Sequence, residues 1–205
     1  MANRGWSPAG WGTAGAVWLT LVGVAVAGCS NSAKAPPQGG GREDMAKDPT
    51  MVVTSAAFGA NQKIPKQYSG EGRDVSPPLA WTGVPAKAKE LAMIVDDPDA
   101  PRAEPWVHWV IYQIAATATG LPEAVPAGEV VASPAGALPG KNTSGQTGYM
   151  GPMPPPGHGV HHYHFKLYAL DAALGLKAGA DQKALLAAMA GHIIAQTELV
   201  GTYER

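Results

Sequence analysis

The chain has 205 residues, of which 45% are hydrophobic and 15% charged, a balance typical of a globular protein with a sizeable core. Its formal net charge of −1 at pH 7 supplies no broad positive field, so the composition argues against nucleic acid as a partner. The 26 glycines and 19 prolines favour a turn-rich, mostly β fold over a helical bundle.

The N-terminal segment has the pattern of an export signal. Arg4 precedes an apolar stretch, residues 14–27, that is about as long as a signal-peptide core and shorter than the roughly 20 residues of a transmembrane helix. The segment closes on VAGC, which resembles the lipobox of bacterial lipoproteins, in which the cysteine thiol receives the lipid. We expect residues 1–28 to be a lipoprotein signal peptide and Cys29 to be lipidated, which would place the protein on a membrane of the cell envelope. An ordinary signal peptide followed by an unmodified cysteine is the alternative.

Residues 29–50 are rich in Gly, Pro and charge and lack apolar periodicity, as expected for a flexible tether. A tether of about twenty residues would span roughly 25 Å and hold a folded domain clear of a bilayer. The folded domain is therefore predicted over residues 51–205.

Two central segments of this domain are predicted to be strands. Residues 90–97 (ELAMIVDD) contain an apolar run without polar alternation, which predicts a strand buried on both faces. Residues 106–114 (WVHWVIYQI) are expected to alternate, and one face of this strand should carry Trp106, His108, Val110 and Tyr112. The following region, 117–156, is dense in Gly, Pro and Ser and is predicted to be an irregular loop of the kind that often carries function.

The C-terminal part contains a further strand, a helix and a last strand. Residues 160–170 have a period of two, which places His161, Tyr163, Phe165 and Leu167 on one face and His162, His164 and Lys166 on the other. Asp181 is predicted to cap a helix in which Leu185, Met189 and Ile193 recur every four residues. Gly191 is not expected to end this helix, and residues 197–205 are predicted to form the last strand.

The stretch DDPDAP, residues 96–101, packs three carboxylates directly behind the first buried strand. Pro98 and Pro101 restrict the residues before them to extended conformations, and in an extended stretch Asp97 and Asp99 point to the same side. Taken alone, the stretch would be better explained as a solvated Asp-Pro turn. Five of the six histidines fall in two segments that can meet this loop only through the fold, which predicts a polar pocket; they are His108, His158, His161, His162 and His164.

Other kinds of site are less well matched by the residues. The segment HGVHHYH could supply imidazole ligands, but its spacing matches no standard zinc pattern, so neither a metal nor a cofactor is predicted. A nucleophile elbow of the GxSxG type is missing from the sequence, and Cys29, the single cysteine, lies outside the domain. The glycines on either side of His158 would let backbone N–H groups approach a bound anion, with His158 as a further donor.

Together, DDPDAP, WVHWV and GYMGPMPPPGHGVHHYHFKLYALD resemble the phosphatidylethanolamine-binding protein family, in its bacterial branch called Raf-kinase-inhibitor-like proteins. The resemblance covers about residues 51–205. It implies a mostly β fold with a large antiparallel sheet, a smaller sheet and flanking helices. It also implies a small anion pocket for phosphate or phosphorylated head groups, lined by the residues Asp97, Asp99, Pro101, His108, Gly151, His161 and Tyr163.

Two positions depart from the family pattern. The family's His-Arg-Tyr is His161-His162-Tyr163 in this chain, so a titratable ring replaces a guanidinium, and anion affinity is expected to be weaker or pH-dependent. The family's Tyr-Thr-Cys-Asp-Gly is YSGEG, residues 68–72, which keeps an acid at Glu71.

The resemblance implies a non-enzymatic protein that binds a small phosphate-bearing ligand or phospholipid head group and is tethered to a membrane by its N-terminal lipid. In the expected pocket each imidazole donates one N–H to an aspartate while its other nitrogen faces the ligand. One alternative is an inhibitor or regulator of a protease or other protein, and a homodimer is left open. A second alternative is a hydrolase that uses Asp97 with His108 or His161 as acid and base.

Overall fold

The computed structural model describes residues 50–128, 130–131, 134 and 136–205. The predicted signal peptide, Cys29 and nearly all of the predicted tether therefore lie outside the described residues. Within the described ranges, no helix is both long enough and apolar enough to cross a membrane.

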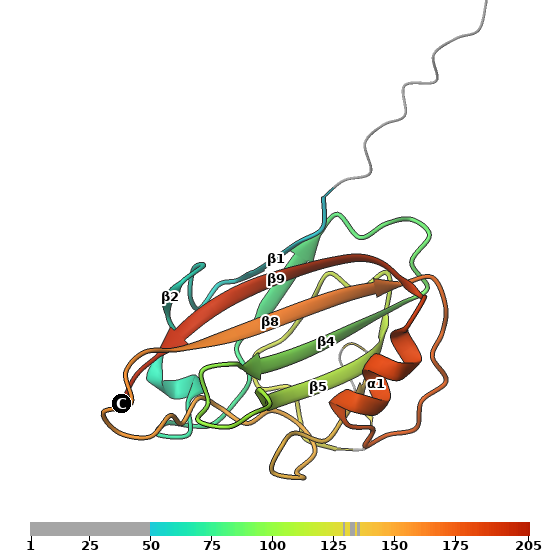
Figure 1. Ribbon diagram of the computed structural model, residues 1–205. Coiled ribbons are helices and arrows are strands. Elements are labelled where there is room, and N and C mark those ends of the chain that lie inside the picture. Colours follow the sequence, from blue (N-terminus) through green and yellow to red (C-terminus); the bar gives the residue numbers. More distant parts are fainter. Residues whose placement is uncertain (1–49, 129, 132–133, 135) are drawn as a thin grey trace, which may run out of the picture. The chain divides into compact units, whose positions relative to one another are not determined.

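The elements follow one another as short strands, three long central strands and a C-terminal helix–strand pair (Figure 1). In chain order they are β1 (Val52–Ser55), β2 (Gln62–Lys63), a 3₁₀ turn η1 (Lys66–Tyr68), β3 (Leu79–Thr82), β4 (Glu90–Asp97), β5 (Trp106–Ala115), β6 (Gly120–Leu121), β7 (Leu138–Pro139), β8 (His161–Leu170), α1 (Gln182–Met189) and β9 (Ile193–Tyr203).

The strands form two sheets. The larger sheet has six strands in the order β2-β9-β8-β4-β5-β7, and the smaller has three in the order β1-β3-β6. The predicted mostly β fold with a large and a small sheet is confirmed, with two differences. The large sheet is mixed, because β2 pairs parallel with β9, and α1 is the only α-helix among the residues that the structure describes.

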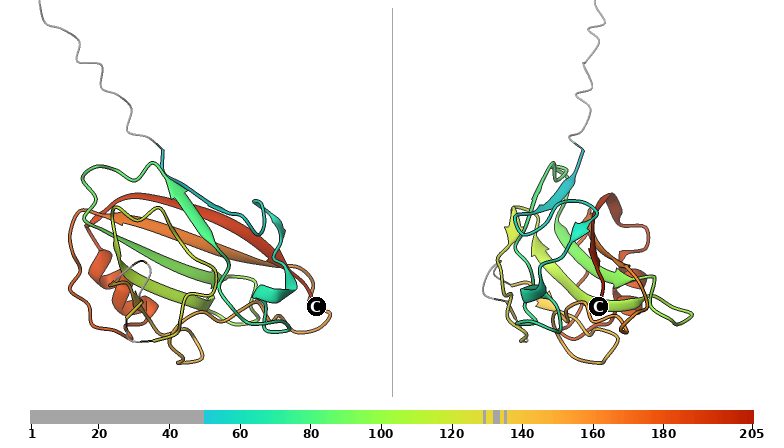
Figure 2. Two further views of the ribbon diagram at one scale, coloured as in Figure 1. Left: turned by 180° about the vertical axis from the view of Figure 1, so that it is seen from behind. Right: turned by 90° about the vertical axis from the view of Figure 1, so that its left-hand side faces the viewer.

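The core is divided between the two faces of the large sheet. The small sheet covers one face, and seen from behind it lies across the long strands (Figure 2). Trp81 of the small sheet and Trp109 and Phe165 of the large one belong to the cluster between the sheets. Leu185 and Met189 of α1 pack against the other face, in a second cluster. All eight residues of β4 are buried, as its unbroken apolar run predicts.

The strict alternation predicted for β5 is wrong, because this strand contains two bulges. Val95 pairs with Trp109 and Asp96 with Val107, so His108 is an extra residue without a partner in the β4 register. The second irregularity includes Gln113, whose φ of 54° lies in the left-handed region. An inserted residue exchanges the faces of the residues beyond it. Val107, Val110 and Tyr112 accordingly belong to the cluster under α1, and Trp109, Ile111 and Ile114 to the cluster between the sheets.

The C-terminal helix begins as predicted and ends earlier. The Asp181 carboxylate accepts the backbone N–H of Ala184 at 2.8 Å, which confirms the predicted cap. The prediction that Gly191 does not end the helix is wrong. α1 ends at Met189, Gly191 has a φ of 81°, and Ile193 is the first residue of β9 with 41% of its surface exposed. Glycine adopts this left-handed conformation without the steric cost that other residues meet, and the chain can therefore turn into the strand.

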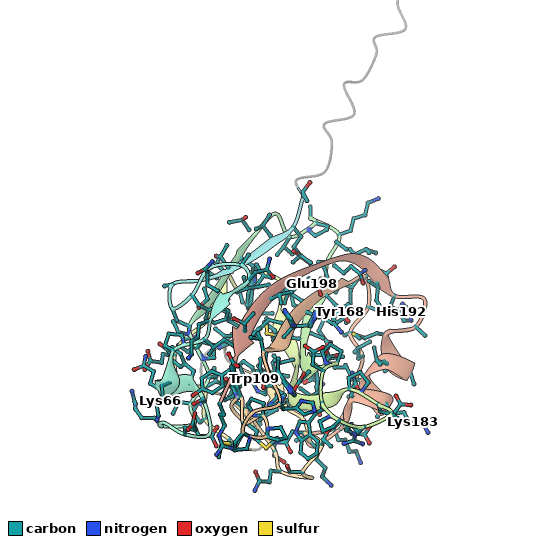
Figure 3. All side chains as sticks on the ribbon, turned by 60° about the vertical axis from the view of Figure 1, so that its left-hand side comes forward. Lys66, Trp109, Tyr168, Lys183, His192 and Glu198 are labelled. Carbon is teal, nitrogen blue, oxygen red and sulfur yellow. The ribbon has the colours of Figure 1, made fainter. Side chains whose placement is uncertain are left out.

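Removal of Lys166 should destabilise the fold. Its ammonium nitrogen lies 2.8 Å from both carboxylate oxygens of Asp96, a buried residue of β4. Because Lys166→Met leaves this carboxylate buried without a cation, we expect a loss of about 2 kcal/mol of unfolding free energy. Urea denaturation measures the loss. Lys183→Met on the exposed side of α1 is the control (Figure 3), and equal midpoints for both variants would contradict the role of the pair.

Candidate functional site

The candidate site lies where β4 ends and β5 and β8 begin. Because β4 is antiparallel to both neighbours, its C-terminal end meets their N-terminal ends, and Asp97 pairs in register with Trp106. Asp97, His108 and His161 thus come together from three separate segments. This end of the sheet lies away from α1 and close to the C-terminus of the chain (Figure 1).

A cavity of about 450 Å³ opens at this end. Six of the eight predicted site residues line it: Asp97, Pro101, His108, Gly151, His161 and Tyr163. The rest of the wall is largely apolar and includes Trp106, Met150, Met153, Pro154 and Pro155, together with Arg102. A mostly apolar cavity of this size with a few polar groups is typical of a small-molecule site. The other two predicted residues, Asp99 and His158, do not line the cavity, although His158 bonds to His161.

Asp97, His161 and His158 form a hydrogen-bonded chain. Nδ1 of His161 lies 2.7 Å from Oδ2 of Asp97, and Nε2 of His161 lies 2.7 Å from Nδ1 of His158. Asp97 and His161 are buried, with 3% and 1% of their surfaces exposed, whereas His158 is exposed. Since a carboxylate only accepts, Nδ1 of His161 carries the proton that Asp97 receives. When His161 is neutral, His158 donates to it; when His161 is protonated, it donates to His158.

Both ring nitrogens of His161 are therefore occupied in this structure. The expected bond from one ring nitrogen to an aspartate is present, but the other nitrogen bonds to His158 and does not face an open ligand position. A ligand can bond directly to Nε2 of His161 only if it displaces the exposed ring of His158.

His108 differs more strongly from the expectation. Its Nδ1 lies 2.8 Å from the backbone carbonyl of Met150 and not on an aspartate. A carbonyl oxygen only accepts, so Nδ1 carries the proton and Nε2 holds a lone pair while the ring is neutral. Burial lowers the pKa of His108, which favours this neutral form. His108 therefore offers the cavity an acceptor, and its ring packs edge-on against Tyr163 at 5.0 Å between centroids.

Tyr163 brings a free donor to the same place. Its hydroxyl is buried and has no hydrogen-bond partner among the described residues. Burial also raises the pKa of Tyr163, so the phenol keeps its proton. A buried hydroxyl without a partner is costly, and because Tyr163 is one of the residues that line the cavity, a ligand there is a candidate partner for it.

Asp99 faces away from the cavity, which corrects the expectation that Asp97 and Asp99 point to the same side. Its Oδ2 accepts the backbone N–H of His162 at 2.8 Å and lies 2.7 Å from Nδ1 of the His162 ring. Partial burial acts to raise the pKa of Asp99, but the hydrogen bonds from His162 outweigh it, and the pKa lies below its ordinary value. His161 and His162 are neighbours on a strand, so their side chains point to opposite faces and draw the two aspartates apart.

Asp74 and Arg205 support the site without a signal in the sequence. The N–H of Gly151 donates to Oδ1 of Asp74 at 2.6 Å, and a Cβ at Gly151 would meet the carbonyl oxygen of Tyr68 at 2.4 Å. Asp74 has a φ of 53°, and nothing in its sequence context separates it from an ordinary surface acid. Glu71 lies 3.7 Å from the Arg205 side chain, which donates to the carbonyl of Pro154 in the cavity wall at 3.3 Å.

The described residues contain no group of three or more His, Cys, Asp and Glu side chains arranged to hold a metal ion. The short contacts in the site are hydrogen bonds, one between the rings of His158 and His161 and one between the His161 ring and the Asp97 carboxylate.

Known proteins are similar to this chain in fold and in sequence. The family model for phosphatidylethanolamine-binding protein matches residues 54–204. A UPF0098 protein of Pyrococcus horikoshii is 48% identical over 167 residues, which are 82% of this chain and 81% of that protein. A Mycobacterium tuberculosis protein named as a lipoprotein, LppC, is 41% identical over 75% of this chain and 72% of its own length.

Two solved structures are similar throughout the domain. A phosphatidylethanolamine-binding protein homologue from Chlamydia trachomatis has 42% identity and a TM-score of 0.69, covering 77% of this chain and 99% of its own. YbcL of Escherichia coli, described as a member of the mammalian family, has 32% identity and a TM-score of 0.70, covering 76% and 98%. The chain belongs to the phosphatidylethanolamine-binding protein family.

Proposed function

We propose that residues 51–205 form a non-enzymatic binding protein that holds a small phosphate-bearing ligand in the cavity between β4, β5 and β8. The observation that carries the proposal is the buried, unpartnered hydroxyl of Tyr163 beside the Asp97–His161 pair in a cavity of about 450 Å³. The family is one of binding proteins, which agrees with this assignment.

The polar groups suit an anion. A phosphate oxygen could accept from the Tyr163 hydroxyl, and a second oxygen could replace His158 as the partner of His161. His161 would then donate through Nε2 as an imidazolium, which the Asp97 carboxylate stabilises from the other side of the ring. His158 would be left free to donate to the ligand from the loop of residues 152–160.

The hydrolase alternative is less well supported. The cavity wall, as formed by the described residues, contains no serine, threonine, cysteine or lysine that could act as a nucleophile. Asp97 already accepts two hydrogen bonds, one from His161 and one from the backbone N–H of Asp99. Nothing observed in the described part of the chain favours the inhibitor alternative.

The proposal extends to the N-terminus. Residues 1–28 would be removed as a signal peptide, Cys29 would carry the lipid, and residues 29–50 would tether the domain to the membrane. The VAGC sequence and the similarity to a protein named as a lipoprotein support this part.

Inorganic phosphate should bind to the full-length chain, and Asp97→Asn and His161→Ala should each weaken binding at least about tenfold, because each removes a charge-assisted hydrogen bond at the site. Isothermal titration calorimetry measures the affinity. Asp171→Ala is the matched control, since Asp171 forms an exposed pair with His192 away from the cavity. Unchanged affinity in both site variants would count against the site.

The Nδ1–H tautomer of His108 should persist in solution, and its ring should titrate with a pKa below its ordinary value because it is buried. NMR titration of the ring nitrogens measures both properties. The pKa of a histidine in water, about 6.5, is the reference. A ring that is protonated at neutral pH would contradict the acceptor role of His108.

Cells that express the full-length chain should contain the mature protein in the membrane fraction, with an intact mass that includes a lipid on Cys29. Cys29→Ser should move the protein out of that fraction, because the thiol that receives the lipid is gone. An unmodified Cys29 in the mature protein would refute the anchor and leave the ligand site unaffected.

A further inference from the structure

The cavity contains one permanent cation, at a position that the family motif does not single out. Arg102 follows the DDPDAP loop and lines the cavity. Its guanidinium carbon lies 5.3 Å from the ring centroid of Trp106, which lines the cavity as well. Within the described part of the chain, no carboxylate forms an ion pair with Arg102. The guanidinium donors are therefore available to a ligand.

The other polar groups of the cavity wall supply no net positive charge. His108 is buried, bonds to a carbonyl through Nδ1 and presents a lone pair. The Asp97–His161 pair carries a net charge of −1 when the imidazole is neutral and 0 when it is protonated. Without Arg102 the cavity wall is thus negative or neutral, and with Arg102 its charge rises by one.

The same hydrogen bonds make the acids poor partners for a cationic head group. Each oxygen of Asp97 already accepts one bond, Oδ2 from His161 and Oδ1 from the N–H of Asp99. Asp99 faces outward onto His162. An ammonium group in the cavity could bond to Nε2 of His108, but its other neighbours would be mainly apolar, because Met150, Met153, Pro154 and Pro155 form much of the wall.

Building on the proposed function, we propose that Arg102, held over Trp106, anchors the anion, and that the ligand is a phosphate monoester of a small apolar group and not of an amino alcohol. The planar guanidinium can donate two parallel N–H bonds to phosphate while its face stays on the indole. A cavity of about 450 Å³ fits a ring-sized group beside the phosphate.

Calorimetry on the full-length chain with phenyl phosphate, phosphoethanolamine and phenol tests this assignment. Phenyl phosphate should bind at least about tenfold more tightly than either of the others, because only it offers both a phosphate and an apolar ring. Arg102→Gln should weaken the binding of phenyl phosphate about tenfold, and the affinity of Arg102→Lys should lie between those of Arg102→Gln and the wild type. Added salt should weaken phenyl phosphate binding to the wild type more than binding to Arg102→Gln, since Arg102 is exposed and salt screens its charge.

Arg73→Gln is the matched control, because Arg73 is an exposed arginine that pairs with Glu123 outside the cavity wall. Equal affinity of the wild type and Arg102→Gln for phenyl phosphate would overturn the role of Arg102 as the anchor. If phosphoethanolamine bound as tightly as phenyl phosphate, the proposed ligand class would be overturned. In both cases weaker phosphate binding by Asp97→Asn would leave the proposed function standing. If the wild type bound none of the phosphates, the proposed function and this inference would fail together.

Discussion

The hydrogen bond between the Asp97 carboxylate and Nδ1 of His161 joins the last residue of β4 to the first residue of β8 inside the protein. A buried carboxylate without a partner is costly, so this bond constrains both strand ends and the loops that leave them. The neighbouring residue Asp96 points the other way and is held by Lys166 of the same strand, β8. Two consecutive acids thus fasten β4 to β8 on both faces of the sheet, and the loop after Asp97 starts from a fixed point.

The bulge at His108 determines what the third strand contributes. In a regular strand, His108 would share a face with Val110, which packs under α1. As an unpaired extra residue, it reaches the opposite side, contacts Tyr163 and donates to the carbonyl of Met150. The donated bond also ties β5 to the loop that forms the cavity wall. A single inserted residue therefore brings an imidazole to the site and supports the loop beside it.

The sequence predicts those parts of the structure that follow from regular periodicity. The apolar run of β4, the alternation of β8 and the cap at Asp181 each depend on local pattern alone, and the structure confirms them. Periodicity assumes a regular pleat, so it could not reveal the bulges of β5. The end of α1 depends on the left-handed backbone of Gly191, which helix propensity does not reveal.

The family motif indicates which side chains gather at the site, but not how they bond to one another. The contact of His158 with His161 depends on the path of a proline-rich loop, which no pattern specifies. The same holds for Arg102, whose place at the cavity follows from the turn of the loop after Pro101. A motif names residue types at positions, whereas the protonation states come from the partners that the fold supplies.

The histidine that replaces the family's arginine can be assessed from these contacts. His162 lies outside the cavity wall, is half-exposed and bonds to Asp99 through its ring and its backbone N–H. Since Asp99 faces outward as well, a change of charge at position 162 acts first on this exposed pair, where solvent weakens it. The cavity has its own cation in Arg102. Replacement of the family's guanidinium at position 162 therefore leaves Arg102 in the cavity wall, and weaker or pH-dependent anion binding stays a prediction.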